Sequence, residues 1–301
     1  MADSIAWPVK TRDLQNHHID STAWDSFKFR DGDVIISTYA KSGTTWMQQI
    51  VSQLIFAGAE GIDVPKLSPW VDFRLIPDEV RKAVDQQAHR RFLKTHLPVD
   101  ALVFSPRAKY IYIGRDGRDA AWSFFNHYSN LSEERRVIMN GPGLVGPPLP
   151  TCPPTALEFY RTWVAENGKP IWPYWDNIRS WWTIRHLPNV KFIHFNQLKT
   201  DLTGSIAGIA AFLNFKLSPE SLARVESHCT FDYMKRHAAL VAPGGGAHFK
   251  GGAATFINKG TNGRWRDELP ADESAAYEAK AVAELGADCA HWLATGEMRA
   301  D

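Results

Sequence analysis

The chain has 301 residues, of which 34 are Lys or Arg and 33 are Asp or Glu, so its formal net charge is only +1. This balance argues against a nucleic acid polymer as the main partner, because binding a long phosphate backbone needs a clustered basic excess. With 44% hydrophobic and 22% charged residues, the composition is that of a globular protein and excludes a disordered or fibrous chain.

Four short apolar runs predict β-strands over residues 34–39, 92–96, 110–115 and 191–195. Their apolar residues are nearly continuous, as expected for strands buried on both faces of a parallel sheet. Helical patterns separate them, over residues 44–57, over residues 119–128, and in a stretch with Trp172, Trp175, Ile178 and Trp182 on one face. For these tryptophans we favour a role in the core over a substrate platform. The alternation predicts a single α/β domain over residues 1–301, with a mostly parallel central sheet flanked by helices.

Two segments break this pattern. Residues 140–154 are rich in proline and glycine and are expected to form an irregular loop. Residues 242–265 contain seven glycines, interleaved with aromatic and basic side chains. Two interpretations stay open for this second segment: a surface loop, or a lid that becomes ordered over a ligand, since long loops in compact domains are often functional.

The strongest chemical signal is the run TYAKSGTTW (38–46), between the first predicted strand and the first predicted helix. Backbone N–H groups at such a turn face the space over the helix N-terminus, where the helix dipole favours an anion. Lys41 adds a positive charge, and Thr44 and Thr45 add hydroxyl donors. The lysine precedes Gly43, so this P-loop-like cradle differs from the G-x-x-x-x-G-K-[ST] form of nucleotide triphosphatases. An ordinary turn capped by Ser or Thr is the simpler alternative. The combination of a lysine, a glycine and two threonines between a buried strand and a helix favours a phosphate site.

Two further motifs lie at the ends of predicted strands. Arg115 ends the third strand, at the edge where open α/β sheets bind ligands, and Ser123 follows about two helical turns later. Taken alone, this motif indicates surface charge at the start of a helix. Together with the phosphate cradle at residues 38–46, it predicts a second phosphate site. In KTHLP (94–98), Lys94 and His96 are two residues apart on a strand, so their side chains point to the same side. His96 could then act as a base while Lys94 neutralises charge.

Together, TYAKSGTTW, KTHLP, the stretch from Arg115 to Ser123 and FINKGTNGRW (256–265) resemble the cytosolic sulfotransferase family. Members of that family move a sulfonyl group from 3′-phosphoadenosine 5′-phosphosulfate (PAPS) to a hydroxyl or an amine. The resemblance covers roughly residues 31–265 and implies an enzyme that sulfonates a small phenol or alcohol without a metal ion. It also implies in-line displacement, in which the protein mainly positions the reactants and neutralises charge.

The resemblance assigns a role to each site residue. His96 would be the catalytic base, with Lys41 and Lys94 stabilising charge on the bridging oxygen. The phosphosulfate would be held by Lys41, Ser42, Gly43, Thr44 and Thr45. The 3′-phosphate would be held by Arg115, Ser123, Asn258, Lys259 and Gly260. The adenine would contact Trp46, Phe195, Cys229 and Phe231.

Some positions depart from the family pattern. Asn258 replaces an arginine, which removes one charge-assisted phosphate contact, and Lys250 and Arg264 are the basic residues that could compensate. Phe195 and Cys229 replace a tyrosine and a threonine, which removes two hydroxyls near the adenine. The C-terminal region lacks the short dimerisation pattern of many animal members. The sequence therefore does not predict the family's dimer, and whether the chain forms another oligomer stays open.

Two other functions stay open at this point. A kinase would share the phosphate cradle but needs its lysine after the glycine and a carboxylate for Mg²⁺. A non-catalytic nucleotide-binding protein would share the whole donor site. The acceptor is expected to be apolar or aromatic, because the candidate pocket walls are Phe73, Phe125, His127, Tyr128, Phe249 and the loop 140–154.

The sequence carries no visible signal for a membrane or an oxidising compartment. The longest apolar run, residues 206–213, is far shorter than the roughly 20 residues of a spanning helix. The N-terminal segment contains acids and no hydrophobic run, so we expect no signal peptide. The three cysteines are far apart and form no CxxC pair, which predicts neither a disulfide framework nor a zinc site. We therefore predict a cytoplasmic protein.

Overall fold

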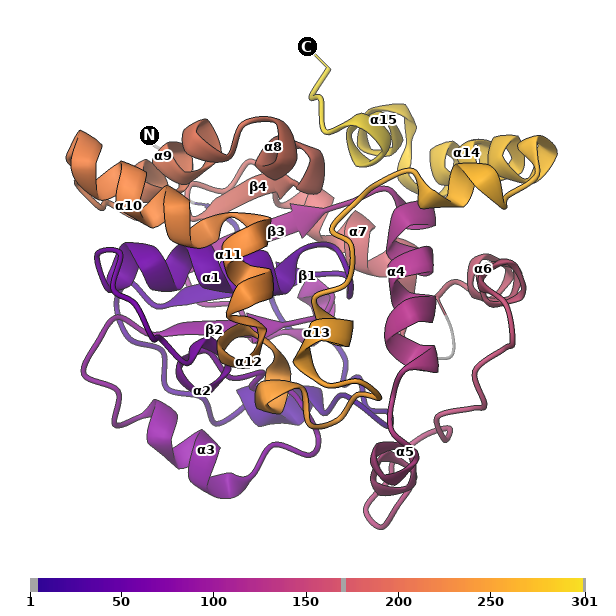
Figure 1. Ribbon diagram of the computed structural model, residues 1–301, viewed down its shortest axis with the longest axis horizontal. Coiled ribbons are helices and arrows are strands. Elements are labelled where there is room, and N and C mark those ends of the chain that lie inside the picture. The colour runs from indigo at the N-terminus through magenta and orange to yellow at the C-terminus, as the bar shows by residue number, and fades with distance from the viewer. Residues whose placement is uncertain (1–4, 169–171, 300–301) are drawn as a thin grey trace.

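The centre of the protein is a parallel sheet whose strands lie in the order β2-β1-β3-β4 (Figure 1). The strands are β1 (Val34–Thr38), β2 (Phe92–Thr95), β3 (Lys109–Gly114) and β4 (Val190–His194). Val34 of β1 pairs with Phe92 on one side and Lys109 on the other. The computed structural model describes residues 5–168 and 172–299, and over these residues the predicted α/β domain with a parallel sheet is confirmed.

Each strand ends one residue earlier than predicted. The residues that follow are Tyr39, His96, Arg115 and Phe195, which leave the sheet at the C-terminal ends of β1, β2, β3 and β4. Because all four strands are parallel, these ends lie at the same edge of the sheet. This is the edge where open α/β sheets bind their ligands.

Helices cover both faces of the sheet (Figure 1). In chain order they are α1 (Thr44–Ile55), α2 (Val64–Leu67), α3 (Asp78–Val84), α4 (Gly117–Ser129), α5 (Glu133–Met139), α6 (Ala156–Ala165), α7 (Tyr174–Thr183), α8 (Phe195–Thr200), α9 (Leu202–Phe212), α10 (Pro219–Cys229), α11 (Phe231–Arg236), α12 (Ala238–Val241), α13 (Ala253–Phe256), α14 (Ala271–Leu285) and α15 (Ala287–Thr295). Short 3-10 helices span Ser21–Trp24, Val99–Ala101, Pro243–Gly246 and Arg264–Asp267.

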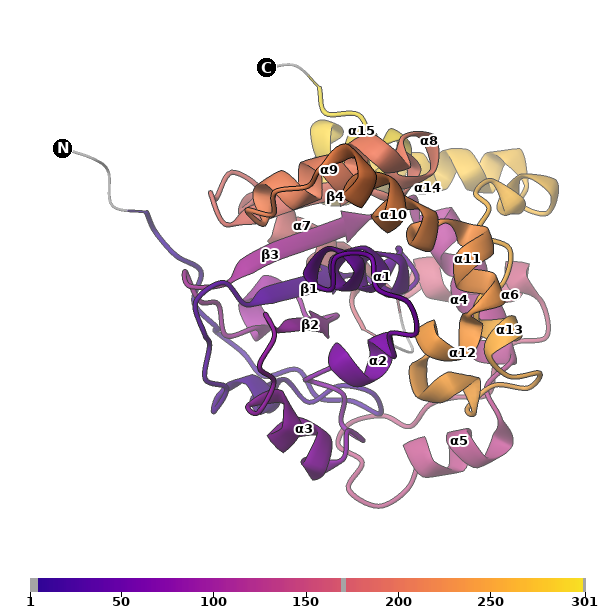
Figure 2. The same ribbon diagram turned by 60° about the vertical axis from the view of Figure 1, so that its left-hand side comes forward.

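Successive strand residues face opposite sides of the sheet, and both sides are buried. Val34 and Ile36 of β1 belong to one apolar cluster, together with residues of α1, α9 and α10. Ile35, between them, belongs to a second cluster with residues of α4, α6, α7, α14 and α15. Figure 2 shows the sheet between α9 and α10 on one side and α7 behind it. Burial on both faces explains why the strands read as continuous apolar runs.

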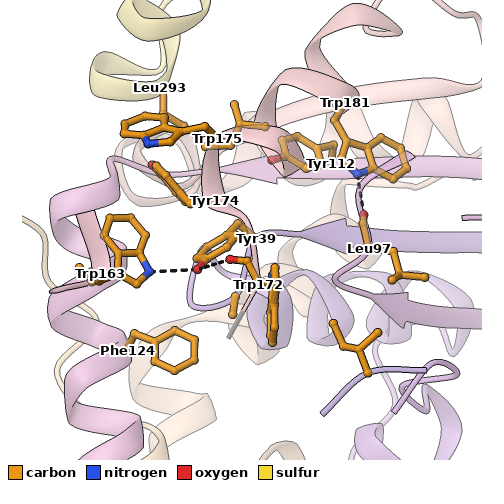
Figure 3. Packing of buried hydrophobic residues seen from close by; sticks show 14 of the residues in the cluster. Tyr39, Leu97, Tyr112, Phe124, Trp163, Trp172, Tyr174, Trp175, Trp181 and Leu293 are labelled. Atoms are coloured by element: carbon orange, nitrogen blue, oxygen red, sulfur yellow. Dashed lines mark hydrogen bonds between the residues drawn. The ribbon is translucent and has the colours of Figure 1, made fainter. Parts of the chain in front are cut away.

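The tryptophan-rich helix differs from the prediction. Helix α7 begins at Tyr174, so Trp172 precedes it, and its buried face consists of Trp175, Ile178 and Trp181 rather than Trp182. Trp181 Nε1 donates to the Leu97 carbonyl oxygen at 3.0 Å (Figure 3). The indole therefore supports the chain just beyond His96.

A second buried contact in this cluster fixes the chain at the end of β1. Trp163 Nε1 donates to the Tyr39 hydroxyl at 3.0 Å, and this hydroxyl lies 3.4 Å from the Trp172 carbonyl oxygen (Figure 3). Most tryptophans of this region thus form core, as predicted, and Trp163 and Trp181 also brace the sheet edge at which the strands end.

Segment 242–265 is not regular, as predicted, but it contains α13 and the 3-10 helix Pro243–Gly246. It runs from α12 towards α14 across the front of the view in Figure 1. Gly260 has a φ of 62°, and a Cβ there would lie 2.6 Å from the Phe231 ring. Only glycine therefore allows this segment to approach α11 so closely. The loop 140–154 is irregular, as predicted.

Candidate active site

The turn between β1 and α1 has an unusual backbone. Lys41 has a φ of 68° and Gly43 a φ of 115°, both in the left-handed region. For a lysine this conformation is strained and persists only where its surroundings hold it. Here Arg115 Nη1 donates to the Lys41 carbonyl at 3.0 Å, and the Ser42 N–H donates to the Tyr39 carbonyl. Helix α1 then begins at Thr44, so its N-terminus and dipole face the space above the turn.

A cavity of about 1300 Å³ lies over this sheet edge. It is larger than the typical pocket for one drug-sized ligand and has room for two reactants. Most of the sequence-predicted site residues line it: Lys41, Gly43, Thr44, Thr45, Trp46, Lys94, His96, Arg115, Ser123, Phe195, Phe231, Asn258, Lys259 and Gly260. The structure therefore brings together motifs that are more than a hundred residues apart in the chain.

Ser42 and Cys229 are the exceptions, since neither contributes to the described lining of the cavity. Ser42 is buried, and its N–H closes the turn to Tyr39 instead of facing the cavity. The Cys229 side chain is fully buried at the end of α10, while its carbonyl oxygen accepts a 2.7 Å hydrogen bond from Trp46 Nε1. Cys229 thus orients the Trp46 indole through its backbone, while its side chain lies outside the described lining of the cavity.

His96 has one ring nitrogen fixed by the protein. Its Nδ1 lies 2.9 Å from the carbonyl oxygen of Thr38 and 3.1 Å from the hydroxyl of the same residue. A carbonyl cannot donate, so the hydrogen bond to it requires the proton on Nδ1 and leaves Nε2 as an acceptor. Asn177 Nδ2 donates to the His96 carbonyl at 2.9 Å and holds the backbone.

The charge state of His96 follows from its surroundings. Burial, together with the positive charges of Lys94 and Lys41, lowers the pKa of His96 to about 3, against the effect of the hydrogen bond to Thr38. The imidazole is therefore neutral at neutral pH, with Nε2 unprotonated. The ring stacks on Trp172 at 5.6 Å between centroids and meets Trp70 edge-on at 4.7 Å.

Lys94 and Lys41 are two cations with no acidic partner within ion-pair distance in the described part of the chain. Burial lowers the pKa of Lys94 to about 8, although Asp72 acts in the opposite direction. Burial, Lys94 and Arg115 together lower the pKa of Lys41 to about 7. Lys41 Nζ lies 3.4 Å from His127 Nδ1 and 4.8 Å from the centre of the Phe256 ring. Two such cations beside a helix N-terminus form a strongly electropositive site for an anion.

Arg115 connects three parts of the cavity wall. Besides the bond to Lys41, its guanidinium donates to the Thr261 carbonyl at 3.1 Å and to Asn262 Oδ1 at 2.7 Å. It also lies 4.2 Å above the centre of the Phe195 ring. Burial lowers the pKa of Arg115 to about 10, which leaves it charged at neutral pH. The side chain therefore joins the turn after β1 to segment 242–265 while lining the cavity.

Three aromatic rings from separate helices also line this side of the cavity. Trp46 lies at the start of α1, Phe195 at the start of α8 and Phe231 at the start of α11. Trp46 meets Phe195 edge-on at 5.6 Å. These rings provide flat apolar walls of the kind that hold a nucleobase.

The basic residues expected to compensate for Asn258 differ in position. Arg264 lines the cavity, whereas Lys250 is exposed and does not belong to the described lining. Lys199 Nζ donates to the Gly260 carbonyl at 2.8 Å, which ties the Asn258–Gly260 stretch to α8.

The acceptor side is only partly as predicted. Phe73, His127 and Phe249 line the cavity, whereas Phe125, Tyr128 and the loop 140–154 are not in its described lining. Tyr128 is instead buried and bonded to the Pro150 carbonyl. The lining residues that no sequence motif indicates include His18, Trp70 and Arg135, and Trp172, which was expected only in the core, lines the cavity as well.

No group of three or more His, Cys, Asp or Glu among the described residues is arranged to hold a metal ion. None of the helices described is both long and apolar enough to cross a membrane.

Comparisons with known proteins identify the family. The family model of the sulfotransferase domain matches residues 31–285. A glycolipid sulfotransferase of Mycobacterium bovis is 32% identical in an alignment of 285 residues that covers 86% of this chain and 86% of that protein. Human sulfotransferase 2B1 is 29% identical over 290 residues, covering 91% of this chain and 71% of that protein. The crystal structure of a mouse sulfotransferase complexed with PAP has the same fold, with a TM-score of 0.69 and 22% identity over 90% of each chain.

The family match covers every motif described above, and the relatives align along most of their length. The chain therefore belongs to the sulfotransferase family.

Proposed function

We propose that this sulfotransferase uses PAPS as donor and transfers its sulfonyl group to the hydroxyl of a small acceptor with an apolar or aromatic body. The observation that carries the proposal is that one cavity contains both the cationic turn before α1 and the imidazole of His96. The comparisons support the class of reaction, and the mycobacterial relative is named for glycolipid acceptors.

The donor side has the groups that PAPS requires. Lys41, Thr44 and Thr45 surround the N-terminus of α1, which suits the 5′-phosphosulfate. Arg115, Ser123 and Lys259 suit the 3′-phosphate, together with Asn258 and Gly260. Trp46, Phe195 and Phe231 frame the adenine. When bound, PAPS supplies the sulfonyl group and the leaving group, adenosine 3′,5′-bisphosphate.

His96 is the proposed general base. Its Nε2 accepts the proton of the acceptor hydroxyl while that oxygen attacks, and the bond from Nδ1 to Thr38 stabilises the imidazolium that forms. The positive charges of Lys41 and Lys94 lie near His96 and lower its pKa. The negative charge of a bound donor would act in the opposite direction and raise the pKa of His96. The two lysines would neutralise the charge that develops on the bridging oxygen.

The acceptor side is mainly aromatic. Trp70, Phe73 and Trp172 line it next to His96, which suits a phenol or an alcohol on an apolar body. The cavity also reaches Leu75, Ile76, Pro77 and Val80 near α3 and Val241 on α12. This apolar extension gives room for a longer chain on the acceptor, in keeping with the glycolipid relative.

Segment 242–265 is the proposed lid. Asn258, Lys259 and Gly260 line the donor side, whereas His248 and Phe249 lie towards the acceptor side. One segment therefore contacts both halves of the cavity. Its seven glycines lose more backbone freedom on ordering than other residues would, so ordering the segment is costly. We therefore expect the segment to become fully ordered only when a ligand is bound.

The test is turnover. The purified protein is incubated with PAPS and a panel of phenols, steroids, flavonoids and aliphatic alcohols, and sulfonated product and released adenosine 3′,5′-bisphosphate are measured together. The proposal requires the two products in equal amounts. Binding of the bisphosphate without product from any acceptor would favour a non-catalytic nucleotide-binding protein, and turnover of ATP with Mg²⁺ but not of PAPS would favour a kinase.

A further inference from the structure

The acceptor end of the cavity has a polar group that no interaction within the protein explains. His18 is 8% exposed and lines the cavity, and its Nδ1 has no hydrogen-bond partner among the described residues. Its ring stacks on Trp70 at 6.2 Å and meets Trp172 edge-on at 6.1 Å. This Nδ1 is shielded from the cavity as well as from solvent, so Nε2 is the nitrogen of the His18 ring that can meet a ligand atom at this wall.

Arg135 of α5 lines the same end. Its guanidinium lies 5.0 Å above the centre of the Phe73 ring and makes no hydrogen bond or ion pair with the described residues. The neighbouring Arg136, in contrast, donates to the Tyr128 carbonyl and stacks on the Tyr128 ring. A half-buried guanidinium without a partner is an anion site, because its donors match the two oxygens of a carboxylate.

The titratable groups that act on these two residues are all basic side chains. Burial lowers the pKa of His18 well below its ordinary value, and His17, His127, Arg135 and His96 act in the same direction. Burial and Arg74 lower the pKa of Arg135. The acidic residues that line the cavity are engaged elsewhere or exposed: Asp119 accepts from the Gly263 N–H, Asp63 caps α2, and Glu79 faces solvent on α3.

The geometry points to an acceptor that carries a carboxylate in addition to its reacting hydroxyl, with Arg135 binding the carboxylate and His18 donating a second hydrogen bond to it. This inference rests on the proposed function and names the class of acceptor. The stacked pair Trp70 and Phe73, 5.0 Å apart, separates His96 from Arg135 and would hold the apolar body between the two polar ends.

The experiment compares matched acceptors. ω-(4-Hydroxyphenyl)alkanoates of increasing chain length are assayed with PAPS beside their methyl esters, which differ only in the charge. We expect kcat/KM to favour the carboxylate by about tenfold or more at the chain length that spans the two ends, as for a charge-assisted hydrogen bond. In Arg135→Gln this preference is expected to disappear, and in Arg135→Lys to persist in part. His18→Phe, which keeps the ring stacking, is expected to reduce it.

Lys250→Gln is the matched control, because it also removes one positive charge near the cavity but lies outside its described lining. It is expected to keep the full preference. Equal kcat/KM for acids and esters in the unmodified enzyme, or a preference that survives in Arg135→Gln, overturns the inference. In both cases transfer to the phenols still occurs, so the proposed function survives. Absence of transfer to either series would refute the phenol acceptor itself.

Discussion

Replacing Arg115 tests whether the two phosphates of the donor have separate sites. Arg115→Met keeps the apolar stem over Phe195 but removes the charged donors that reach Lys41, Thr261 and Asn262. Losing a charge-assisted hydrogen bond costs about 1.5–3 kcal/mol. Binding of adenosine 3′,5′-bisphosphate is therefore expected to weaken by about 10- to 150-fold. Binding of 5′-AMP, which lacks the 3′-phosphate, is expected to weaken by no more than a few-fold.

The same substitution also leaves the carbonyls of Lys41 and Thr261 without their donor, and we expect the free energy of unfolding to fall by about 2 kcal/mol. Isothermal titration calorimetry with both nucleotides measures the loss of binding separately from the loss of folding stability. Asn262→Ala is the control, since it removes a hydrogen-bond partner of the Arg115 guanidinium but keeps the guanidinium charge. Equal losses for the two nucleotides in Arg115→Met would refute a 3′-phosphate site and leave Arg115 as a support of the turn before α1.

Three further predictions concern the donor side. The lowered pKa values of Lys41 (about 7) and Lys94 (about 8) mean that the free enzyme loses positive charge as the pH rises through this range, so kcat/KM for PAPS is expected to fall with rising pH; a rate that climbs there instead contradicts the role of the lysines. Asn258→Arg is expected to tighten adenosine 3′,5′-bisphosphate binding by about tenfold, because the new guanidinium adds a charge-assisted contact to the 3′-phosphate. An unchanged affinity by calorimetry would count against a 3′-phosphate site at residue 258. Hydrogen exchange across residues 242–265 is expected to slow when the bisphosphate binds, and equal protection with and without it rules out the lid.

The sheet was predictable because each strand is buried on both faces, which produces an apolar run that is visible in the sequence. The exact ends of the strands were not predictable, since the residues that follow them, such as Tyr39 and Phe195, are buried aromatic residues that continue the apolar run. The start of the tryptophan-rich helix was placed wrongly for a local reason. Pro173 precedes Tyr174, and a residue before proline disfavours the helical conformation, so Trp172 stays outside α7.

That the residues proposed to hold the donor line one cavity could be predicted, because they lie in short local motifs at strand ends, where chemistry and backbone geometry coincide. The walls proposed for the acceptor could be predicted only in part, for Phe73, His127 and Phe249, because they come from separate segments that only tertiary packing brings together. His18 has no motif around it and reaches the cavity because Arg74, next to Phe73, donates its backbone N–H to the His18 carbonyl at 2.8 Å. Asn177, which holds the His96 backbone, is likewise far away in sequence. The cytoplasmic location stays a prediction.

The most direct test of the account is the rate of sulfonyl transfer by His96→Ala, measured beside its affinity for adenosine 3′,5′-bisphosphate. Nε2 of His96 faces no partner among the described residues, whereas the proposed donor contacts are assigned to other side chains. We therefore predict a loss of about 10²–10⁴-fold in kcat, with nucleotide affinity within a few-fold of the unmodified enzyme, while His291→Ala on α15 changes neither. Transfer at close to the unmodified rate in His96→Ala would contradict the assignment of this cavity as the reaction site with His96 as its base.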